Sequence, residues 1–367
     1  MRFLILGNGN ITSALLGILE GLGESDQWDI TVVDIREGIS GEEWIREHHG
    51  EIDAVVNLTD AVVYPILEAC GRYSLGYIDA GFEAEEEGAA YLAAYRKLLA
   101  SPKNAPHLFG FGMNPGIVEL INLKYAPERP YIACEIDTDL AAAESPEVPE
   151  LFGTWSPRTY AEELVAAPAY VLDREKDLIP VGDAARYNIP LTVGGRTESY
   201  CVVPHEELPC FLRGNGNCYG SVFLYRGPSP LQEYLLAGHV GPSKAKMIPT
   251  ARCLKGAESV GILFYDGSDR LRYVRNRSDH AWAYRFCGHN ATCYQTACGV
   301  YTAMKLLPLV PRNASMSFTD AAKYLGEEID AILRKLHFTF EVIDNALDRR
   351  AFEERILPLF ADAEAVR

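Results

Sequence analysis

The chain has 367 residues, of which 48% are hydrophobic and 23% are charged, and its formal net charge is −17. A chain of this length is too long for one ordinary hydrophobic core, so the sequence predicts two domains. The strongly negative charge argues against nucleic-acid binding, which requires a basic surface. Such a charge either serves solubility alone or concentrates cationic partners around the protein.

Nothing in the sequence points to a membrane or to secretion. The apolar stretches are shorter than a bilayer-spanning helix requires, and the N-terminal apolar segment is too short for a signal peptide. The nine cysteines are an odd number without Cys-x-x-Cys spacing. This indicates reduced core thiols rather than disulfides or a zinc site. We therefore expect a cytoplasmic protein without a bound metal.

The N-terminal 34 residues carry the strongest pattern. An apolar run at 2–6 predicts a strand, the turn Gly7-Asn8-Gly9-Asn10 follows it, and residues 11–19 have helical spacing. A second apolar run at 30–33 predicts another strand, which ends at Asp34. This order of strand, glycine turn, helix, strand and terminal acid is typical of a Rossmann-type dinucleotide-binding unit.

Each residue of this pattern has a physical role. Gly7 permits the tight turn, and Gly9 lets the backbone approach a pyrophosphate at the helix N-terminus. The third glycine of the usual pattern is replaced by Thr12. Asp34 would accept hydrogen bonds from a ribose diol and repel a 2′-phosphate, which favours NAD over NADP, although Arg36 could weaken this preference. The alternative is a glycine turn that serves only packing.

The alternation of strands and helices continues beyond Asp34. Strands are expected at 53–58, 75–79 and 107–112, and helices at 41–50, 63–73 and 85–99. A doubly wound parallel sheet binds its ligand at the carboxyl ends of its strands. We therefore expect the polar residues at these strand ends to line one cleft: Asn57, Asp60, Asp79 and Asn114.

The pattern changes near Pro127. We interpret residues 1–126 as a Rossmann domain with a doubly wound parallel sheet, and residues 127–289 as a second, mixed α/β domain for substrate binding and dimerisation. Residues 290–367 are expected to form a helical segment that packs back between the domains, with helical spacing at 291–306 and 318–336. The fold class is therefore α/β.

Two groups of residues in the second domain are candidates for chemistry. Trp155 and Glu163 combine an aromatic face with a carboxylate, which suits a cationic amine. In an extended stretch His205 and Glu207 would lie on one face, because side chains alternate with period two. Such a pair can accept a proton and stabilise the resulting charge. The alternatives are an ordinary core tryptophan and a solvated strand end.

Taken together, these segments resemble the homospermidine synthases, within the broader saccharopine-dehydrogenase-like group. The resemblance runs nearly from end to end and rests on the order of short motifs rather than on any one of them. The motifs are the glycine turn, Val56-Asn57-Leu58, Tyr77-Ile78-Asp79, Gly112-Met113-Asn114-Pro115-Gly116, Glu135-x-Asp137-Thr138, Thr154-Trp155-Ser156 with Glu163, His205-x-Glu207, 258–263 and Asn290-Ala291-Thr292.

The resemblance implies an enzyme that uses bound NAD to transfer an aminobutyl group between diamines. Hydride leaves putrescine, a second amine replaces ammonia on the resulting imine, and the hydride returns. The resemblance also implies a homodimer. The catalytic residues it implies are His205, Glu207, Trp155 and Glu163. The substrate-binding residues are Glu135, Asn114, Glu258 and Asp60. The cofactor-binding residues are Gly7, Gly9, Asn10, Ile11, Asp34, Asn57, Leu58, Thr59, Asp79, Asn114 and Pro115.

Two features depart from the family pattern. The chain is shorter than typical bacterial homospermidine synthases, and Arg158 brings a positive charge near the expected cation site. If Arg158 pointed inward it could pair with a substrate carboxylate. The protein would then be a reductive-condensation dehydrogenase of the saccharopine or carboxyspermidine type. A further alternative is a non-catalytic dinucleotide or polyamine sensor.

Overall fold

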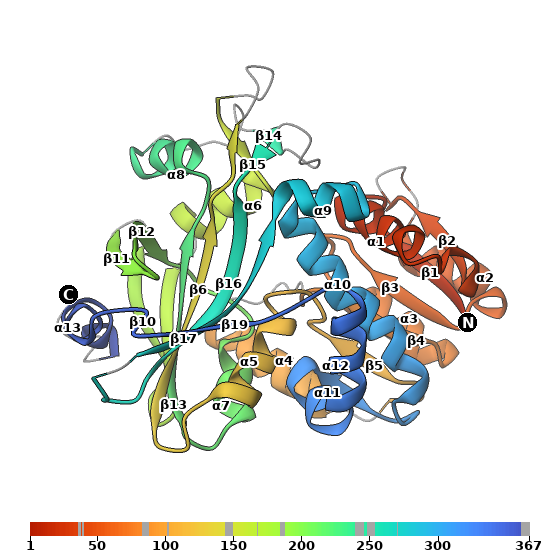
Figure 1. The fold of residues 1–367 in the computed structure, drawn as a ribbon. Coiled ribbons are helices and arrows are strands. Elements are labelled where there is room, and N and C mark those ends of the chain that lie inside the picture. Colours follow the sequence, from red (N-terminus) through yellow and green to blue (C-terminus); the bar gives the residue numbers. More distant parts are fainter. Residues whose placement is uncertain are drawn as a thin grey trace. The chain divides into compact units, whose positions relative to one another are not determined.

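The computed structural model describes residues 1–35, 38, 40–82, 88–100, 103–143, 150–166, 168–183, 188–238, 246–247, 254–269 and 271–360. The chain divides into two compact units (Figure 1). The first unit contains Met1–Ile117, Arg285–His289 and Cys293–Phe338. The second contains Val118–Tyr284, Asn290–Thr292 and Thr339–Arg367.

The first unit is built on a parallel sheet, which among the described residues has six strands in the order β2-β1-β3-β4-β5-β18. The chain starts at β1 and adds β2 on one side and β3 on the other, so the switch point of this doubly wound order lies between β1 and β3. The predicted Rossmann-type fold is confirmed. The strands are β1 (Arg2–Leu6), β2 (Asp29–Val33), β3 (Ala54–Asn57), β4 (Gly76–Asp79), β5 (His107–Phe109) and β18 (Ser315–Ser317).

Helices connect and cover these strands. The longer ones are α1 (Asn10–Gly21), α2 (Gly41–His48), α3 (Tyr64–Tyr73), α4 (Gly88–Ala100), α10 (Ala291–Leu306), α11 (Phe318–Tyr324) and α12 (Gly326–Lys335). The pattern at 318–336 predicts one helix, but the structure has two. Helix α11 ends at Leu325, where φ is −128° and ψ is 37°. The next residue, Gly326, is a poor helix former and begins α12.

Helix α10 packs tightly within the first unit. A Cβ atom at Gly299 would lie 2.2 Å from the carbonyl oxygen of Gly112, so only glycine permits this approach. The same helix carries Tyr301 and Met304 into the hydrophobic core. This packing explains why Cys293–Phe338, although far from the N-terminus in sequence, belongs to the first unit.

The second unit contains a mixed sheet, which in the described part of the chain has nine strands in the order β10-β9-β13-β6-β16-β17-β19. Strand β12 also pairs with β13, and β11 pairs with β12. Strand β6 lies between β13, to which it is parallel, and β16, to which it is antiparallel (Figure 1). The strands are β6 (Tyr131–Asp139), β9 (Pro168–Asp173), β10 (Asp177–Asp183), β11 (Ile189–Val193), β12 (Arg196–Val202), β13 (Cys218–Arg226), β16 (Ala257–Tyr265), β17 (Arg272–Asp279) and β19 (Glu341–Asp344).

The remaining elements are short. The helices are α5 (Ile117–Tyr125), α6 (Pro157–Ala161) with the π-helical turn η4 (Glu162–Ala166), α7 (Leu208–Gly214), α8 (Ser229–Leu236), α9 (His280–Cys287) and α13 (Arg349–Arg355). Two further small sheets pair β7 (Ala142–Ala143) with β15 (Leu254–Lys255) and β8 (Phe152–Gly153) with β14 (Lys246–Met247). No helix among the described residues is long and apolar enough to cross a bilayer.

The unit boundaries differ from the predicted ones. The first boundary falls at Ile117 rather than at residue 126 because α5 packs on the second unit. There the Asn122 side chain donates to the Phe211 carbonyl at 3.0 Å and accepts from the Tyr131 hydroxyl at 2.6 Å. The segment 290–367 is not one body either. Its last part joins the second unit, where β19 pairs with β17.

Candidate functional site

The glycine turn after β1 has the geometry of a pyrophosphate-binding turn. Gly7 has φ +100°, and a Cβ atom there would lie 2.6 Å from the Leu58 carbonyl oxygen. The Thr12 hydroxyl donates to the Gly7 carbonyl at 2.7 Å, so the residue in place of the third glycine fastens the turn. Gly9 is the N-cap of α1, without a side-chain cap, and open space surrounds the position of its missing Cβ. Because no side chain caps it, the N-terminus of α1 is suited to receive phosphate oxygens.

The other predicted cofactor residues lie at the strand ends of the first unit. Asn57 accepts hydrogen bonds from the backbone and hydroxyl of Thr59 and donates to the Tyr77 hydroxyl at 3.2 Å. The Asp79 carboxylate accepts from the Gly110 backbone N–H at 2.7 Å. These two side chains are almost fully buried and fix the loops that follow β3 and β5. Their direct contact with a cofactor stays a prediction.

The remaining residues predicted in the first unit differ in exposure. Asn10, Ile11, Asp34, Leu58, Thr59 and Asn114 are partly buried, Pro115 is buried, and Asp60 is exposed. The peptide bond between Asn114 and Pro115 is cis. Arg36, which could weaken the preference for NAD, lies outside the described residues.

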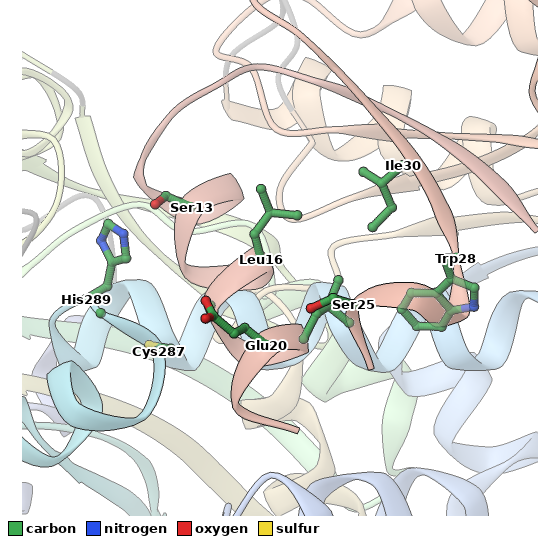
Figure 2. Close-up of a pocket in the computed structure, with 11 residues that line it drawn as sticks. Ser13, Leu16, Glu20, Ser25, Trp28, Ile30, Cys287 and His289 are labelled. Carbon is green, nitrogen blue, oxygen red and sulfur yellow. The ribbon is translucent and has the colours of Figure 1, made fainter. Parts of the chain in front are cut away.

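A separate hollow of about 560 Å³ lies along the outer side of α1. Figure 2 shows His289 at one end of it and Trp28 at the other, with Leu16 and Glu20 of α1 between them. None of its lining residues belongs to the glycine turn. This hollow is therefore distinct from the predicted pyrophosphate site.

The second unit concentrates buried acids on one face of its sheet. Glu135, Asp137 and Asp139 alternate along β6, so their side chains share one face. Glu258 on β16 is the direct neighbour of Asp139 and extends the row. We call these four residues the acidic face. Each is no more than 6% exposed, so the face keeps four carboxyl groups almost entirely away from water.

Asp139 and Glu258 are held by a network of neutral donors. Asp139 accepts from the Thr154 hydroxyl and from the Ala141 backbone N–H, the latter at 2.7 Å. The Thr292 hydroxyl donates to Glu258 at 2.8 Å, and Glu258 also shares a hydrogen bond with Asp137. Burial, together with the charges of Asp139 and Asp137, raises the pKa of Glu258 well above its ordinary value. These contacts favour the protonated form of Glu258 over its carboxylate.

His280 lies beside Asp139 and Glu258 and is held by a hydrogen bond of its own. Its Nδ1 accepts from the Ala291 backbone N–H at 3.1 Å, so the hydrogen of the neutral ring is on Nε2. Nε2 lies 3.4 Å from Asp139. Asp139, Glu258 and His280 are close enough to surround a metal ion. In this tautomer, however, Nε2 carries a hydrogen and has no lone pair with which to bind a metal. We therefore interpret the three residues as a hydrogen-bonded cluster rather than as a metal site.

His205 and Glu207 form the predicted pair, but not in an extended stretch. The chain turns at 206–207, and Glu207 immediately precedes α7 with φ −78° and ψ −16°. This turn brings the fully buried Glu207 carboxylate onto His205 Nδ1 in a short hydrogen bond. Glu206 approaches the same nitrogen at 3.4 Å. The predicted contact exists, although the predicted local structure is wrong, because α7 begins at Leu208 with Pro209 in its first turn.

The charges of this pair shift both pKa values. Burial acts to lower the pKa of His205, but the carboxylates of Glu207, Glu206 and Glu163 outweigh it and raise the pKa to about 10. Burial acts to raise the pKa of Glu207, but His205 and a hydrogen bond with Glu135 outweigh it and lower the pKa. The pair therefore favours the charged form of His205, with Glu207 as its counter-ion, and the role of His205 as a proton acceptor stays a prediction.

Trp155 lies at the edge of an aromatic group beside the acidic face. Its indole N–H donates to the Tyr225 hydroxyl at 2.7 Å, and Tyr160 packs edge-on against Tyr225 with ring centroids 4.8 Å apart. Trp155 is partly exposed, whereas Tyr160 is buried. Tyr225 is the neighbour of Asp137 in the sheet. The partly exposed indole is therefore not an ordinary core residue.

Arg158 points away from this group. Its side chain is 76% exposed and pairs with Glu162 at 2.8 Å, one helical turn later. Glu163, by contrast, is partly buried and acts on the charge of His205. The inward orientation that a carboxylated substrate would need is not observed for Arg158.

Several members of the acidic face and its surroundings were not predicted as site residues. Asp137 and Asp139 could have been found from the alternation Glu-x-Asp-x-Asp at 135–139, which puts three acids on one face of a strand. Tyr225, Tyr160 and His280 have no such local signal, because only the pairing of distant strands and loops brings them to the acids.

The two units define a Rossmann-type α/β protein with a second, mixed α/β unit. No family model matches the chain, and no curated protein sequence matches it. Solved structures that share its fold include two proteins named for their activities. The homospermidine synthase of Legionella pneumophila, solved with NAD, is 14% identical with a TM-score of 0.75, covering 93% of this chain and 91% of that one. The apo saccharopine dehydrogenase (L-Glu forming) of Saccharomyces cerevisiae is 12% identical with a TM-score of 0.56, covering 93% and 99%.

Proposed function

We propose that the protein is an NAD-dependent enzyme of the homospermidine synthase type. It would join two putrescine molecules into homospermidine and release ammonia. The observation that carries this proposal is the acidic face with Glu207, five carboxyl groups that are each no more than 6% exposed. A carboxylate near an ammonium favours the charged forms of both groups. An alkyl diamine carries one ammonium at each end and would be attracted to such a concentration of carboxyl groups.

The proposal assigns the cofactor to the first unit. The turn at Gly7 and the open N-terminus of α1 fit a pyrophosphate, and Asp34 at the end of β2 suits a ribose diol. When bound, NAD supplies an acceptor that takes a hydride from the substrate and returns it, so no net redox change results. The expected preference is for NAD over NADP.

The residues of the second unit would bind the amine and move its proton. Trp155 would place its face against the cation, which contributes about 0.5–2 kcal/mol. An alkylammonium, with a pKa of about 10.4, must lose a proton before the adjacent carbon can release hydride. His205 has a pKa of about 10, closely matched to that amine. A bound cation would lower the pKa of His205 by repulsion, leaving Glu207 to stabilise the transferred charge.

The first test is a product assay. Incubation with putrescine and a catalytic amount of NAD should give homospermidine and one ammonia per turnover, measured by chromatography, without accumulation of NADH. Stoichiometric consumption of NADH with a carbonyl substrate would instead indicate a reductive-condensation dehydrogenase. The proposal also includes a cytoplasmic location and a homodimer. Light scattering after size-exclusion chromatography tests the oligomeric state.

Substitutions then separate the amine site from the cofactor site. W155A should lower turnover at least about tenfold while the Kd for NAD changes less than twofold, because the proposal places the indole against the amine substrate and not against the cofactor. E163Q and E162Q form a matched pair on the same helical turn. E163Q should raise the KM for putrescine, whereas E162Q, which loses only the outward pair with Arg158, should not. Unchanged product formation by W155A would remove the indole from the mechanism.

A further inference from the structure

The reverse side of the central strands of the second unit holds a cavity of about 210 Å³. Side chains at alternate positions of a strand face opposite sides, so Thr138 and Ser259 point away from the acidic face. Thr138 is the neighbour of Ser259, and Ser259 is the neighbour of Arg277, across β6, β16 and β17. The three residues therefore form one row, and all three line the cavity.

Two members of this row have unused hydrogen-bonding capacity. Ser259 is 2% exposed, and its hydroxyl has no hydrogen-bond partner. Buried hydroxyls are rarely left in this state. In the part of the chain that the structure describes, Arg277 takes part in no ion pair or side-chain hydrogen bond, although its neighbours on β17 do. A free guanidinium next to an unpartnered buried hydroxyl is an arrangement suited to an oxyanion.

The rest of the lining adds positive charge. Arg275 pairs with Glu341 at 3.1 Å, and Arg196 pairs with Glu198 at 2.6 Å. Of these two acids only Glu198 lines the cavity, so three arginines face one glutamate there. The pKa of Glu198 is lowered, because Arg196 and Arg226 outweigh the effect of its burial. The cavity is thus cationic in a chain whose net charge is −17.

We propose that this cavity binds a compact tetrahedral oxyanion of the phosphate type. The Arg277 guanidinium would take two oxygens through its planar fork of donors, and the Ser259 hydroxyl would donate to a third. The volume suffices, since it corresponds to several waters at about 30 Å³ each. The site is independent of the proposed amine chemistry, which lies on the opposite side of the same strands.

The test is calorimetric titration of the full chain with inorganic phosphate at constant ionic strength. Wild type should bind one phosphate, and R277Q should bind it at least about tenfold more weakly, as expected for loss of one charge-assisted contact. S259A should weaken it severalfold. The matched control is R272Q, which removes the same charge from the same strand at a position that does not line the cavity. R272Q should bind phosphate as wild type does.

Three outcomes would overturn the proposal. The first is no phosphate binding by wild type tighter than about 10 mM. The second is equal loss in R272Q and R277Q, which would indicate general electrostatic attraction. The third is tighter binding of succinate than of phosphate, which would replace the tetrahedral anion by a carboxylate. Urea unfolding of each variant confirms that it is folded, and Arg277 is exposed, so its replacement should leave the fold intact.

Discussion

Two buried glutamates, one in each unit, are stabilised in opposite ways. Glu24 in the first unit is 3% exposed and Glu258 in the second is 1% exposed. Glu24 contacts the ammonium groups of Lys305 and Lys335 and accepts from the Tyr301 hydroxyl at 2.7 Å. Burial acts to raise its pKa, but the lysines outweigh it and lower the pKa to about 2. Glu258, by contrast, has its pKa raised well above the ordinary value.

The different partners of Glu24 and Glu258 distinguish a charge that stabilises the fold from a carboxyl group of the candidate site. The first unit brings its own cations to Glu24, so the carboxylate is neutralised within the fold. Glu258 and its neighbour Asp139 receive hydroxyl, backbone and imidazole partners and another carboxyl. Such a cluster lowers its energy by holding protons or by receiving a cation from outside. The acidic face therefore fits the cationic ligand of the proposed function better than it fits a purely stabilising role.

The largest expected effect concerns Glu207. In E207Q His205 loses the carboxylate that stabilises its charge, so turnover of putrescine should fall about 100-fold or more. The Kd for NAD should stay within about twofold, because the glycine turn is in the other unit. The matched variant is E206Q, which lies 3.4 Å from the same imidazole and is more exposed. It should cost less activity than E207Q. Equal losses would mean that overall negative charge matters, not the buried pair.

The next largest effect concerns Glu24, the glutamate that is neutralised within the fold. E24Q should lower the free energy of unfolding by about 3 kcal/mol at neutral pH, the equivalent of a pKa change from 4.5 to about 2. The contribution of Glu24 is fully present above its ordinary pKa and is lost as pH falls toward 2. The difference between wild type and E24Q should therefore vanish in acid. Urea unfolding across pH measures it, with the exposed α1 residue variant E20Q as control.

A smaller effect tests the His205 pair directly. The His205 imidazole should titrate near pH 10 in wild type, followed by nuclear magnetic resonance, and at least about one unit lower in E207Q. Because its folded pKa lies above the ordinary 6.5, its contribution to stability is complete below 6.5 and is lost as pH rises through about 10. Addition of putrescine should also lower this pKa. Titration near 6.5 in both proteins would contradict the pairing.

The fold of the first unit could be predicted from the sequence because its signals are local. Strand β1, the turn at Gly7 and helix α1 follow one another within 21 residues, and the structure has them within one or two residues of the expected bounds. The expected helix at 318–336 was wrong because apolar spacing does not register a break as short as Leu325-Gly326. The compact units divide at Ile117 rather than at the expected residue 126. The sequence of α5 has helical spacing but gives no indication of which unit the helix packs on.

The candidate site was predicted in part, for a related reason. His205 and Glu207 are two residues apart, so their contact could be expected although the local backbone was not. The neighbours of Glu258 are Asp139 across the sheet and Thr292 in the first turn of α10. No periodicity within one segment reports such pairings. For the same reason the sequence alone does not predict the row of Thr138, Ser259 and Arg277, which depends on the register of three strands.

The smallest expected effect is that of E258Q. The raised pKa of Glu258 favours its protonated form. Glutamine, which is nearly the same size, can still accept from Thr292 and donate toward Asp137. The free energy of unfolding should change by less than about 1 kcal/mol, because neutral hydrogen bonds are exchanged for similar ones. D139N should cost more, since Asp139 accepts from Thr154 and Ala141, and an amide has only one accepting oxygen. If E258Q were as destabilising as E24Q, Glu258 would be an ionised carboxylate, and the contrast between the two glutamates would fail.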